Sequence, residues 1–187
     1  MSGIQNDAVK TPSPLSRTRE RVSTTPLGHV GQVGILVPEI ATAVDTYSAL
    51  FGIASWWRST YGPGRVPTLM YRGQEGTFSM HIALGGERPQ IELVQSRSGP
   101  SIYEEHLRLR GSGLHHLGVF VASLDDAIAK MEGLGFSVLQ LGRGYGLDGD
   151  GGFAYFDTVS AFSIVIEAIE QPRRRAPSCT TDEVMTP

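Results

Sequence analysis

His116 is the residue whose type and position first suggest chemistry. Residues 114–121 alternate as in a strand, and from Leu117 to Val121 every second side chain is aliphatic. The aliphatic face is expected to pack under the helix that the sequence predicts directly after this strand. His116 lies on the opposite face, so we expect it to point into the space that this other face of the sheet encloses. A histidine in that place is either a structural side chain, a metal ligand or a proton carrier.

The same pattern occurs 84 positions earlier, which favours an internal duplication. Residues 32–37 fall on residues 116–121, and apolar positions in the segments that follow also coincide. The coincident pairs are Ile40 with Leu124, Ala43 with Ala127, Val44 with Ile128 and Leu50 with Leu134. The chain is therefore expected to contain two similar units, each with one equivalent first strand.

Gln32 takes the position of His116 in the first unit. His29 is a more familiar type of ligand, but it lies three residues before Gln32. An odd separation places two residues on opposite faces of a strand. We therefore expect Gln32, and not His29, to face the same space as His116.

Composition and charge exclude several classes of function. The 187 residues carry a net charge of -3, which is not the basic surface of a nucleic-acid-binding protein. No apolar run reaches about 18 residues, so no membrane span is expected. The N-terminus also lacks the apolar core of a secretory signal. The single cysteine, Cys179, can form no internal disulfide, which favours a reducing, cytoplasmic location.

Both ends of the chain have compositions typical of mobile segments. Residues 1–26 and 172–187 are rich in serine, threonine, proline and basic residues, without apolar periodicity. We interpret them as a flexible N-terminal extension and a flexible C-terminal tail around a domain at residues 27–171. Three consecutive arginines, residues 173–175, could contact an anionic partner, but we interpret them as part of a solvated terminus.

The domain is predicted to be α+β, with two tandem βαβββ modules at residues 27–98 and 112–171 that a short helix at 101–110 joins. In each module a strand is followed by a helix with an apolar stripe, and then by strands between turn residues. The first helix ends at Gly52, and the second begins after the predicted N-cap Ser123. Strands after the two helices are expected near residues 56–58, 67–72, 78–84 and 90–94, and near residues 137–141, 153–156 and 163–169.

Residues 142–152 are the one glycine-rich stretch inside the domain, with six glycines in eleven residues. The stretch has no Lys-Ser or Lys-Thr pair and does not follow the strand–glycine turn–helix order, which argues against a phosphate-binding loop. It is either a flexible lid or a disordered hairpin.

With this organisation the chain resembles the vicinal oxygen chelate superfamily, which includes glyoxalase I, methylmalonyl-CoA epimerase, extradiol dioxygenases and bleomycin-resistance proteins. The resemblance is carried by residues 90–94, residues 111–116, and residues 155–158 with residues 166–167. It covers about residues 28–171 and looks closest to the methylmalonyl-CoA epimerase-like and glyoxalase I-like branch. It implies two βαβββ modules whose sheets curl into an open, barrel-like cavity around one divalent metal ion.

The resemblance also implies the metal ligands, one from the first strand and one from the last strand of each module. Carried over by position, these are Gln32 and Glu92, then His116 and Glu167. One imidazole, one amide oxygen and two carboxylates suit octahedral Zn, Co, Ni, Mn or Mg, with positions open for two substrate oxygens, and Fe is less expected. Two glutamates flanked by aliphatic residues would also be costly to bury without a cation.

The activity that the resemblance implies is that of a metal-dependent isomerase, epimerase or lyase. Such an enzyme abstracts a proton next to a metal-held carbonyl of a small oxygenated substrate, through an enolate or enediolate. Glu167 is the expected base, because the resembled isomerases use that position as ligand and proton carrier. His81 is the second candidate acid or base: even-numbered residues from Phe78 to Leu84 are apolar, so odd-numbered His81 would look into the cavity. A packed or surface His81 is the alternative.

Three other functions stay open. An extradiol-type ring-cleaving dioxygenase uses two histidines and one carboxylate around iron, and Gln32 stands where the first histidine belongs. A metal-free binding or sequestering protein of the resistance type would use the cavity without chemistry, and metal in the purified protein would argue against it. A structural or interaction module would be expected to expose an apolar patch.

For partners we expect a small-molecule substrate, apolar or a thioester, and a homodimer. Trp56, Trp57 and Tyr61 either line the mouth of the cavity for an apolar substrate or belong to the core. Neither nucleic acid nor a membrane is expected as a partner.

Overall fold

The structure, a computed structural model, describes residues 27–179 of the chain. The predicted N-terminal extension, residues 1–26, and the last part of the predicted tail, residues 180–187, lie outside the described residues. Within residues 27–179 none of the helices combines the length and the apolar character that a membrane span requires.

The first module begins with a strand and a helix whose ends are set by local caps. The carboxylate of Glu39 accepts hydrogen bonds from the N–H groups of Ala41 and Thr42 at 2.8 and 2.7 Å, where helix α2 (Ile40–Phe51) begins. Gly52 ends the helix in the left-handed region, at a φ of 66°. The strands of this module are β1 (Val30–Leu36), β2 (Trp56–Tyr61), β5 (Ser79–Gly85) and β6 (Gln90–Ser98).

The second module repeats this order of elements. Helix α4 (Leu124–Gly133) begins at the predicted cap, where Ser123 Oγ accepts a hydrogen bond from the N–H of Asp126 at 3.2 Å. The strands of this module are β7 (Gly113–Phe120), β8 (Val138–Tyr145), β9 (Gly151–Phe156) and β10 (Val165–Glu170). Helix α3 (Ile102–Arg110) joins the modules, and the short α5 (Val159–Phe162) precedes β10. The predicted α+β fold of two βαβββ modules is therefore confirmed.

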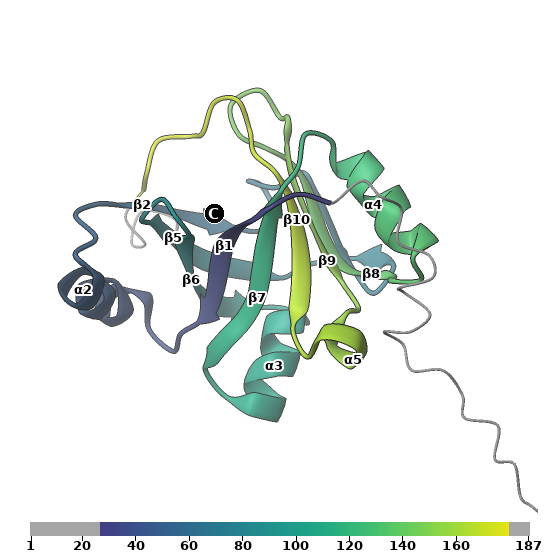
Figure 1. Cartoon of the computed structure of the whole chain (residues 1–187). Coiled ribbons are helices and arrows are strands. Elements are labelled where there is room, and N and C mark those ends of the chain that lie inside the picture. The colour runs from purple at the N-terminus through teal and green to yellow at the C-terminus, as the bar shows by residue number, and fades with distance from the viewer. Residues whose placement is uncertain (1–26, 180–187) are drawn as a thin grey trace, which may run out of the picture.

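The modules meet at the centre of one curled sheet, where β1 pairs with β7 in antiparallel order (Figure 1). The strand order is β2-β5-β6-β1-β7-β10-β9-β8-β3-β4, so each module contributes four adjacent strands in mirrored sequence. β1 and β7 are equivalent, as the 84-residue repeat predicts. Both modules of the sheet belong to one chain.

A hairpin from the first module crosses to the second. Strands β3 (Thr68–Tyr71) and β4 (Gln74–Glu75) lie between β2 and β5 in the chain, but β3 pairs with β8 and not with a strand of its own module. The apolar run at residues 67–72 predicts a strand, but nothing in it identifies the partner. The hairpin extends the second module's side of the sheet and helps to curl it.

The glycine-rich residues 142–152 are an ordered hairpin and not a lid. β8 continues to Tyr145 and β9 starts at Gly151, so residues 146–150 are the turn between them. An added Cβ on Gly142 would lie 2.4 Å from the ring of Phe153 on the facing strand, and one on Gly151 would lie 2.5 Å from the ring of Tyr145. The glycines therefore make room for aromatic rings that cross between the paired strands.

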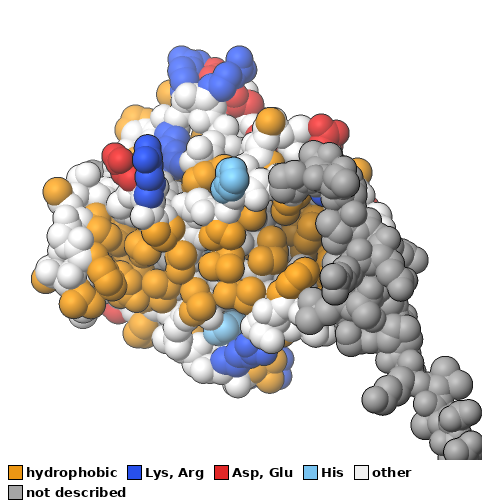
Figure 2. All heavy atoms as spheres, in the orientation of Figure 1, with side chains coloured by type: hydrophobic (Ala, Val, Ile, Leu, Met, Phe, Trp, Pro, Cys, Tyr) orange, Lys and Arg blue, Asp and Glu red, His pale blue; other side chains and the backbone are white. Residues whose placement is uncertain are grey.

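The sheet has a curled inner face and an outer face that the two module helices cover in part. α2 packs outside the first module through Ile40 and Val44, and α4 packs outside the second through Leu124 and Ala127. Between the helices, Ile91, Val33, Leu117 and Ile166 lie side by side across four strands and are half-buried. Figure 2 shows hydrophobic side chains gathered across this face of the molecule.

Two glycines allow the central strands to carry large side chains on the inner face. Gly34 lies opposite His116 in the β1–β7 ladder, and an added Cβ on Gly34 would lie 1.8 Å from His116 Cε1. Gly118 lies opposite Gln32, and an added Cβ there would lie 2.9 Å from Gln32 Oε1. Each glycine thus leaves the space that the polar side chain of the other strand occupies.

We expect Gly34→Ala to destabilise the metal-free protein, because the new methyl group must displace the buried His116 ring or separate the strands. The expected loss is about 1–3 kcal/mol in the free energy of unfolding, measured with urea, as for other overpacked cores. Gly133→Ala is the matched control: a Cβ there meets nothing within 4 Å, and it lies in a helix, so stability should stay equal or rise. If Gly34→Ala were as stable as Gly133→Ala, this explanation of the close β1–β7 pairing would be wrong.

Candidate metal centre

Three buried side chains from three adjacent strands converge on the inner face of the sheet. His116 Nε2 on β7 lies 3.0 Å from Glu92 Oε2 on β6 and 3.1 Å from Glu167 Oε2 on β10. One ligand atom from each residue lies within 4.8 Å of the other two. This is the spacing of groups that can hold one metal ion.

Gln32 adds a fourth donor from β1. It is buried, and it lines the same small cavity, of about 30 Å³, as Glu92 and Glu167. Its Nε2 donates a hydrogen bond to Gln90 Oε1 at 2.9 Å, so its own Oε1 is left for another partner. His29, in contrast, is exposed and precedes β1.

Strand pairing explains why the four residues meet. The parallel β1–β6 ladder places Gly34 beside Glu92, and the parallel β7–β10 ladder places Gly118 beside Glu167. Gln32 and His116 lie two residues before these glycines, on the same face of the sheet. The predicted set therefore comes from four neighbouring strands, β6-β1-β7-β10.

The same four residues carry buried polar atoms without hydrogen-bond partners among the described residues. The atoms are Gln32 Oε1, Glu92 Oε2, His116 Nε2 and Glu167 Oε2. His116 Nε2 lies at ion-pair distance from both carboxylates, 3.0 and 3.1 Å, but no hydrogen bond joins them. Buried polar atoms are rarely left unsatisfied, and a cation between them would satisfy all four at once. One nitrogen and three oxygens are a donor set that fits a divalent metal ion.

Burial and the neighbouring charges change the proton affinity of the cluster. Burial alone would lower the pKa of His116, but the carboxylates of Glu167 and Glu92 outweigh it and raise that pKa to about 10. Burial raises the pKa of Glu167, and the adjacent His116 limits this rise. Without a metal ion the cluster therefore retains protons at neutral pH, and a metal ion must displace them to bind.

His115 supports His116 from behind, and the sequence analysis did not single it out. In the β1–β7 ladder Gly34 pairs with His116 and Ile35 pairs with Leu114, so His115 is the extra residue of a β-bulge. The bulge brings the Nδ1 atoms of the two histidines to 2.9 Å. Burial lowers the pKa of His115 well below its usual value, so a neutral His115 can accept the Nδ1–H of His116. That hydrogen bond leaves the Nε2 lone pair of His116 for a metal ion.

The predicted orientation of His81 is wrong. Met80, Ile82 and Leu84 line the cavity with Glu92, whereas His81 lies on the other face of β5, with its Nδ1 2.8 Å from Thr60 Oγ1. The prediction assumed that an apolar strand face always packs under a helix. Here the cavity itself has an apolar wall, so the apolar face of β5 is the inner one.

The tryptophans differ in position. Trp57 and Tyr61 line a larger pocket, of about 450 Å³, outside the small cavity. Trp56 instead packs against the cluster under α2, where its indole N–H donates to Ser48 Oγ at 2.8 Å. Of the predicted mouth residues, two therefore face a pocket and one belongs to the core.

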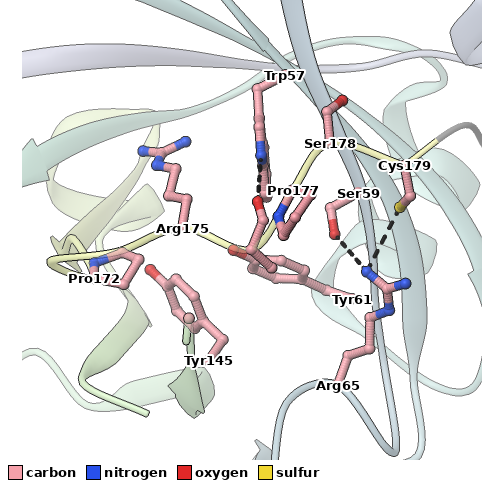
Figure 3. A pocket seen from close by; sticks show the side chains of 12 residues that line it. Trp57, Ser59, Tyr61, Arg65, Tyr145, Pro172, Arg175, Pro177, Ser178 and Cys179 are labelled. Carbon is pink, nitrogen blue, oxygen red and sulfur yellow. Dashed lines mark hydrogen bonds between the residues drawn. The ribbon is translucent and has the colours of Figure 1, made fainter. Parts of the chain in front are cut away.

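Residues 172–179 are attached to the domain, so the predicted flexible tail is wrong for them; we call them the C-terminal strap (Figure 3). At one end the carbonyl of Arg174 accepts a hydrogen bond from the N–H of Leu147 at 2.9 Å. At the other end the N–H of Cys179 donates to the carbonyl of Arg58 on β2 at 3.0 Å. The strap thus runs from the β8–β9 turn to β2, the edge strand of the first module (Figure 1). Most of these contacts involve backbone groups of an irregular segment, for which the sequence has no periodic signal.

Comparisons with known proteins agree with this architecture. A model of the Glyoxalase/Bleomycin resistance protein/Dioxygenase superfamily matches residues 31–156. No curated protein matches the chain significantly. A methylmalonyl-CoA epimerase from Mycobacterium tuberculosis is 20% identical, with a TM-score of 0.55 over 85% of this chain and 95% of that one.

Two further solved structures have the same fold. A methylmalonyl-CoA epimerase from Streptomyces coelicolor, in complex with 2-nitronate-propionyl-CoA, is 16% identical, with a TM-score of 0.55 over 81% of this chain and 100% of that one. A hypothetical protein from Bacillus halodurans is 19% identical, with a TM-score of 0.54 over 79% of this chain and 97% of that one. At these identities the similarity shows the fold alone.

We expect His115→Ala to weaken metal binding without unfolding the protein, because His116 loses the partner that fixes its ring. Loss of such a supporting group typically costs about 10–100-fold in metal affinity. Calorimetric titration with Zn²⁺ or Co²⁺ would measure it. His106→Ala is the control, since its ring contacts His115, at 5.1 Å between centroids, on the side away from His116 and the cavity. Unchanged affinity in His115→Ala would contradict the supporting role.

Proposed function

Because the chain belongs to the Glyoxalase/Bleomycin resistance protein/Dioxygenase superfamily, we propose that it is a divalent-metal-dependent isomerase or epimerase. It would abstract a proton next to a carbonyl of a small oxygenated substrate, and a lyase would use the same first step. The observation that carries the proposal is the cluster of four unsatisfied buried atoms, from Gln32, Glu92, His116 and Glu167. The identity of the metal ion is left open among Zn, Co, Ni, Mn and Mg.

The proposed roles follow from the chemistry of each side chain. Gln32, Glu92, His116 and Glu167 would hold the ion, which when bound would supply Lewis-acid stabilisation of the enolate. Glu167 would accept the substrate proton, because its carboxylate is at the cavity and burial raises its pKa, which makes it a stronger base than a solvated carboxylate. The apolar side chains of Met80, Ile82 and Leu84 would keep water from the abstracted proton.

The substrate class is a proposal that rests on chemistry and fold. Structural neighbours are methylmalonyl-CoA epimerases, and one of them holds 2-nitronate-propionyl-CoA. A thioester activates the adjacent C–H bond and offers a carbonyl oxygen, so thioesters stand first among the candidates. Hemithioacetals of 2-oxoaldehydes and cyclic ketones share the acidic C–H next to a carbonyl.

The two main alternatives are less well supported by the described residues. An extradiol dioxygenase would place two histidines in the cluster, but the convergent residues include one histidine, and Gln32 occupies the equivalent position. A metal-free binding protein would leave four buried polar atoms without partners, which is unfavourable unless a ligand supplies them. Metal analysis of the purified protein separates these functions from the proposed one.

Glu167→Gln should keep much of the bound metal and lose most activity. An amide still offers an oxygen to the ion but cannot accept a proton at neutral pH, and removal of a general base typically costs about 10²–10⁴-fold in rate. Activity would be followed by NMR as exchange of the acidic C–H in heavy water, over a panel of thioesters, hemithioacetals and cyclic ketones.

Glu92→Gln is the matched control, because it makes the same change at the equivalent position of the other module. It should retain more activity than Glu167→Gln at equal metal content. His116→Ala should lose metal and activity together. If Glu92→Gln is inactive and Glu167→Gln is active, the base is assigned to the wrong module.

We also propose that the protein is a homodimer that buries the outer face of the central strands. The row Ile91, Val33, Leu117 and Ile166 is apolar, half-buried and uncovered by α2 or α4 among the described residues. Leu117→Glu should convert a dimer to a monomer in light scattering, because it places a charge in the middle of the row. Leu109→Glu, at an exposed position on α3, should not. A monomeric wild-type protein would refute the proposal.

A further inference from the structure

The three consecutive arginines of the C-terminal strap have different environments. Arg173 pairs with Asp150 at 2.7 Å, and Arg174 pairs with Asp148, so both attach the strap to the β8–β9 turn. Arg175 makes no ion pair with a carboxylate among residues 27–179. Its guanidinium lies over the ring of Trp57, with Cζ 5.2 Å from the ring centroid. Two of the arginines therefore anchor the strap, and the third is left for another anion.

Arg175 stands at the boundary between the metal cavity and the larger outer pocket. It lines the small cavity together with Gln32, Glu92 and Glu167, and it also lines the outer pocket (Figure 3). Tyr61 is a wall of both spaces in the same way. The two spaces thus adjoin, and a molecule that reached the four donors from the outer pocket would pass Arg175.

The volumes of the two spaces decide where a substrate would lie. The small cavity, at about 30 Å³, has room for an ion and a water molecule but not for an organic molecule. The outer pocket, at about 450 Å³, has the size of a ligand site. The part of a substrate beyond its two reacting oxygens would therefore occupy the outer pocket.

The wall of the outer pocket is cationic and aromatic. It contains two arginines, Arg65 and Arg175, and among residues 27–179 none of those that line it is acidic. Within the described part of the chain, the guanidinium of Arg65 has two long contacts, to Ser59 Oγ at 3.5 Å and to Cys179 Sγ at 3.6 Å. Trp57 and Tyr61 add flat apolar surfaces. A guanidinium binds a carboxylate through two parallel hydrogen bonds, so this wall matches a flat or apolar body with an anionic group.

We infer that Arg175 is a specificity determinant that selects substrates with a carboxylate at the end remote from the reacting carbonyl. The inference rests on the proposed function, because the position of that carboxylate is defined relative to oxygens held at the metal centre. In this arrangement the strap is part of the binding site, and the two spaces receive the two ends of one anionic substrate.

Two probes of equal shape test the inference. Para-carboxybenzohydroxamate and para-carbamoylbenzohydroxamate share a chelating group with two adjacent oxygens, and they differ only in the charge at the far end. Their affinities would be measured with the cobalt-loaded protein from its visible spectrum. Wild-type protein should prefer the carboxylate probe by about tenfold or more, the value of one charge-assisted contact.

Three variants separate a specific contact from general charge. Arg175→Gln should bring the ratio of the two affinities close to one, with the affinity for the carbamoyl probe unchanged. Arg175→Lys should restore part of the preference. Arg108→Gln removes the same charge at an exposed position on α3 that lines neither space, and it should keep the wild-type ratio. Equal binding of both probes to wild-type protein, or a preference that survives in Arg175→Gln, would overturn the inference and leave the metal centre intact.

A separate measurement tests the role of Arg175 if the proposed function is wrong. If neither hydroxamate changes the cobalt spectrum, the metal-centred function is wrong, and terephthalate binding to metal-free protein then decides the inference by calorimetry. Binding by wild-type protein that Arg175→Gln loses would support the anion site without the metal centre. Absence of binding to wild-type protein would overturn the inference as well.

Discussion

The close approach of β1 and β7 is the constraint on which the rest of the structure depends. Gly34 and Gly118 leave the space that the side chains of His116 and Gln32 occupy on the inner face. The two strands belong to different modules, so the contact that joins the modules also creates the place where their polar atoms meet. The candidate metal centre is therefore not attached to a finished fold. It is made by the same packing that makes one sheet from two modules. A change that separates β1 from β7 would therefore also move the four candidate ligands apart.

The electrostatics of the cluster connect folding to ligation. Burial of two carboxylates and an imidazole costs free energy unless their charges are balanced. In the metal-free protein, protons supply the balance: the two carboxylates outweigh the effect of burial and raise the pKa of His116 to about 10, and burial raises the pKa of Glu167. A divalent ion that replaced these protons in the folded chain, and did not bind the unfolded chain, would add its binding free energy to stability. The cluster is thus the proposed chemical centre and, with an ion bound, would also stabilise the sheet.

Much of the fold and of the candidate site could be predicted because both follow from the repeat. The 84-residue offset identified β1 and β7 as equivalent, and the period of a strand chose Gln32 over His29. Features that depend on contacts outside the repeat could not be predicted. His81 was placed on the wrong face because an apolar wall of a cavity and an apolar face under a helix have the same pattern. His115 was missed because a β-bulge interrupts the alternation of inward and outward side chains in β7. The strap was missed because arginine–aspartate ion pairs and backbone hydrogen bonds produce no periodic pattern in the sequence.

The strap lies outside the duplicated units, and it therefore adds an asymmetry that the repeat does not contain. The cavity walls of the two modules already differ, with Met80, Ile82 and Leu84 on the side of the first module and Phe153 and Tyr155 on the side of the second. A planar enolate of the proposed kind has two faces, and reprotonation of one of them requires that the two sides differ. Residues 172–179 cross the mouth from one module to the other, and they place Arg175 on one side only. In the proposed reaction the asymmetry of the mouth would therefore be a stereochemical device, because it would help to distinguish the two faces of a flat intermediate.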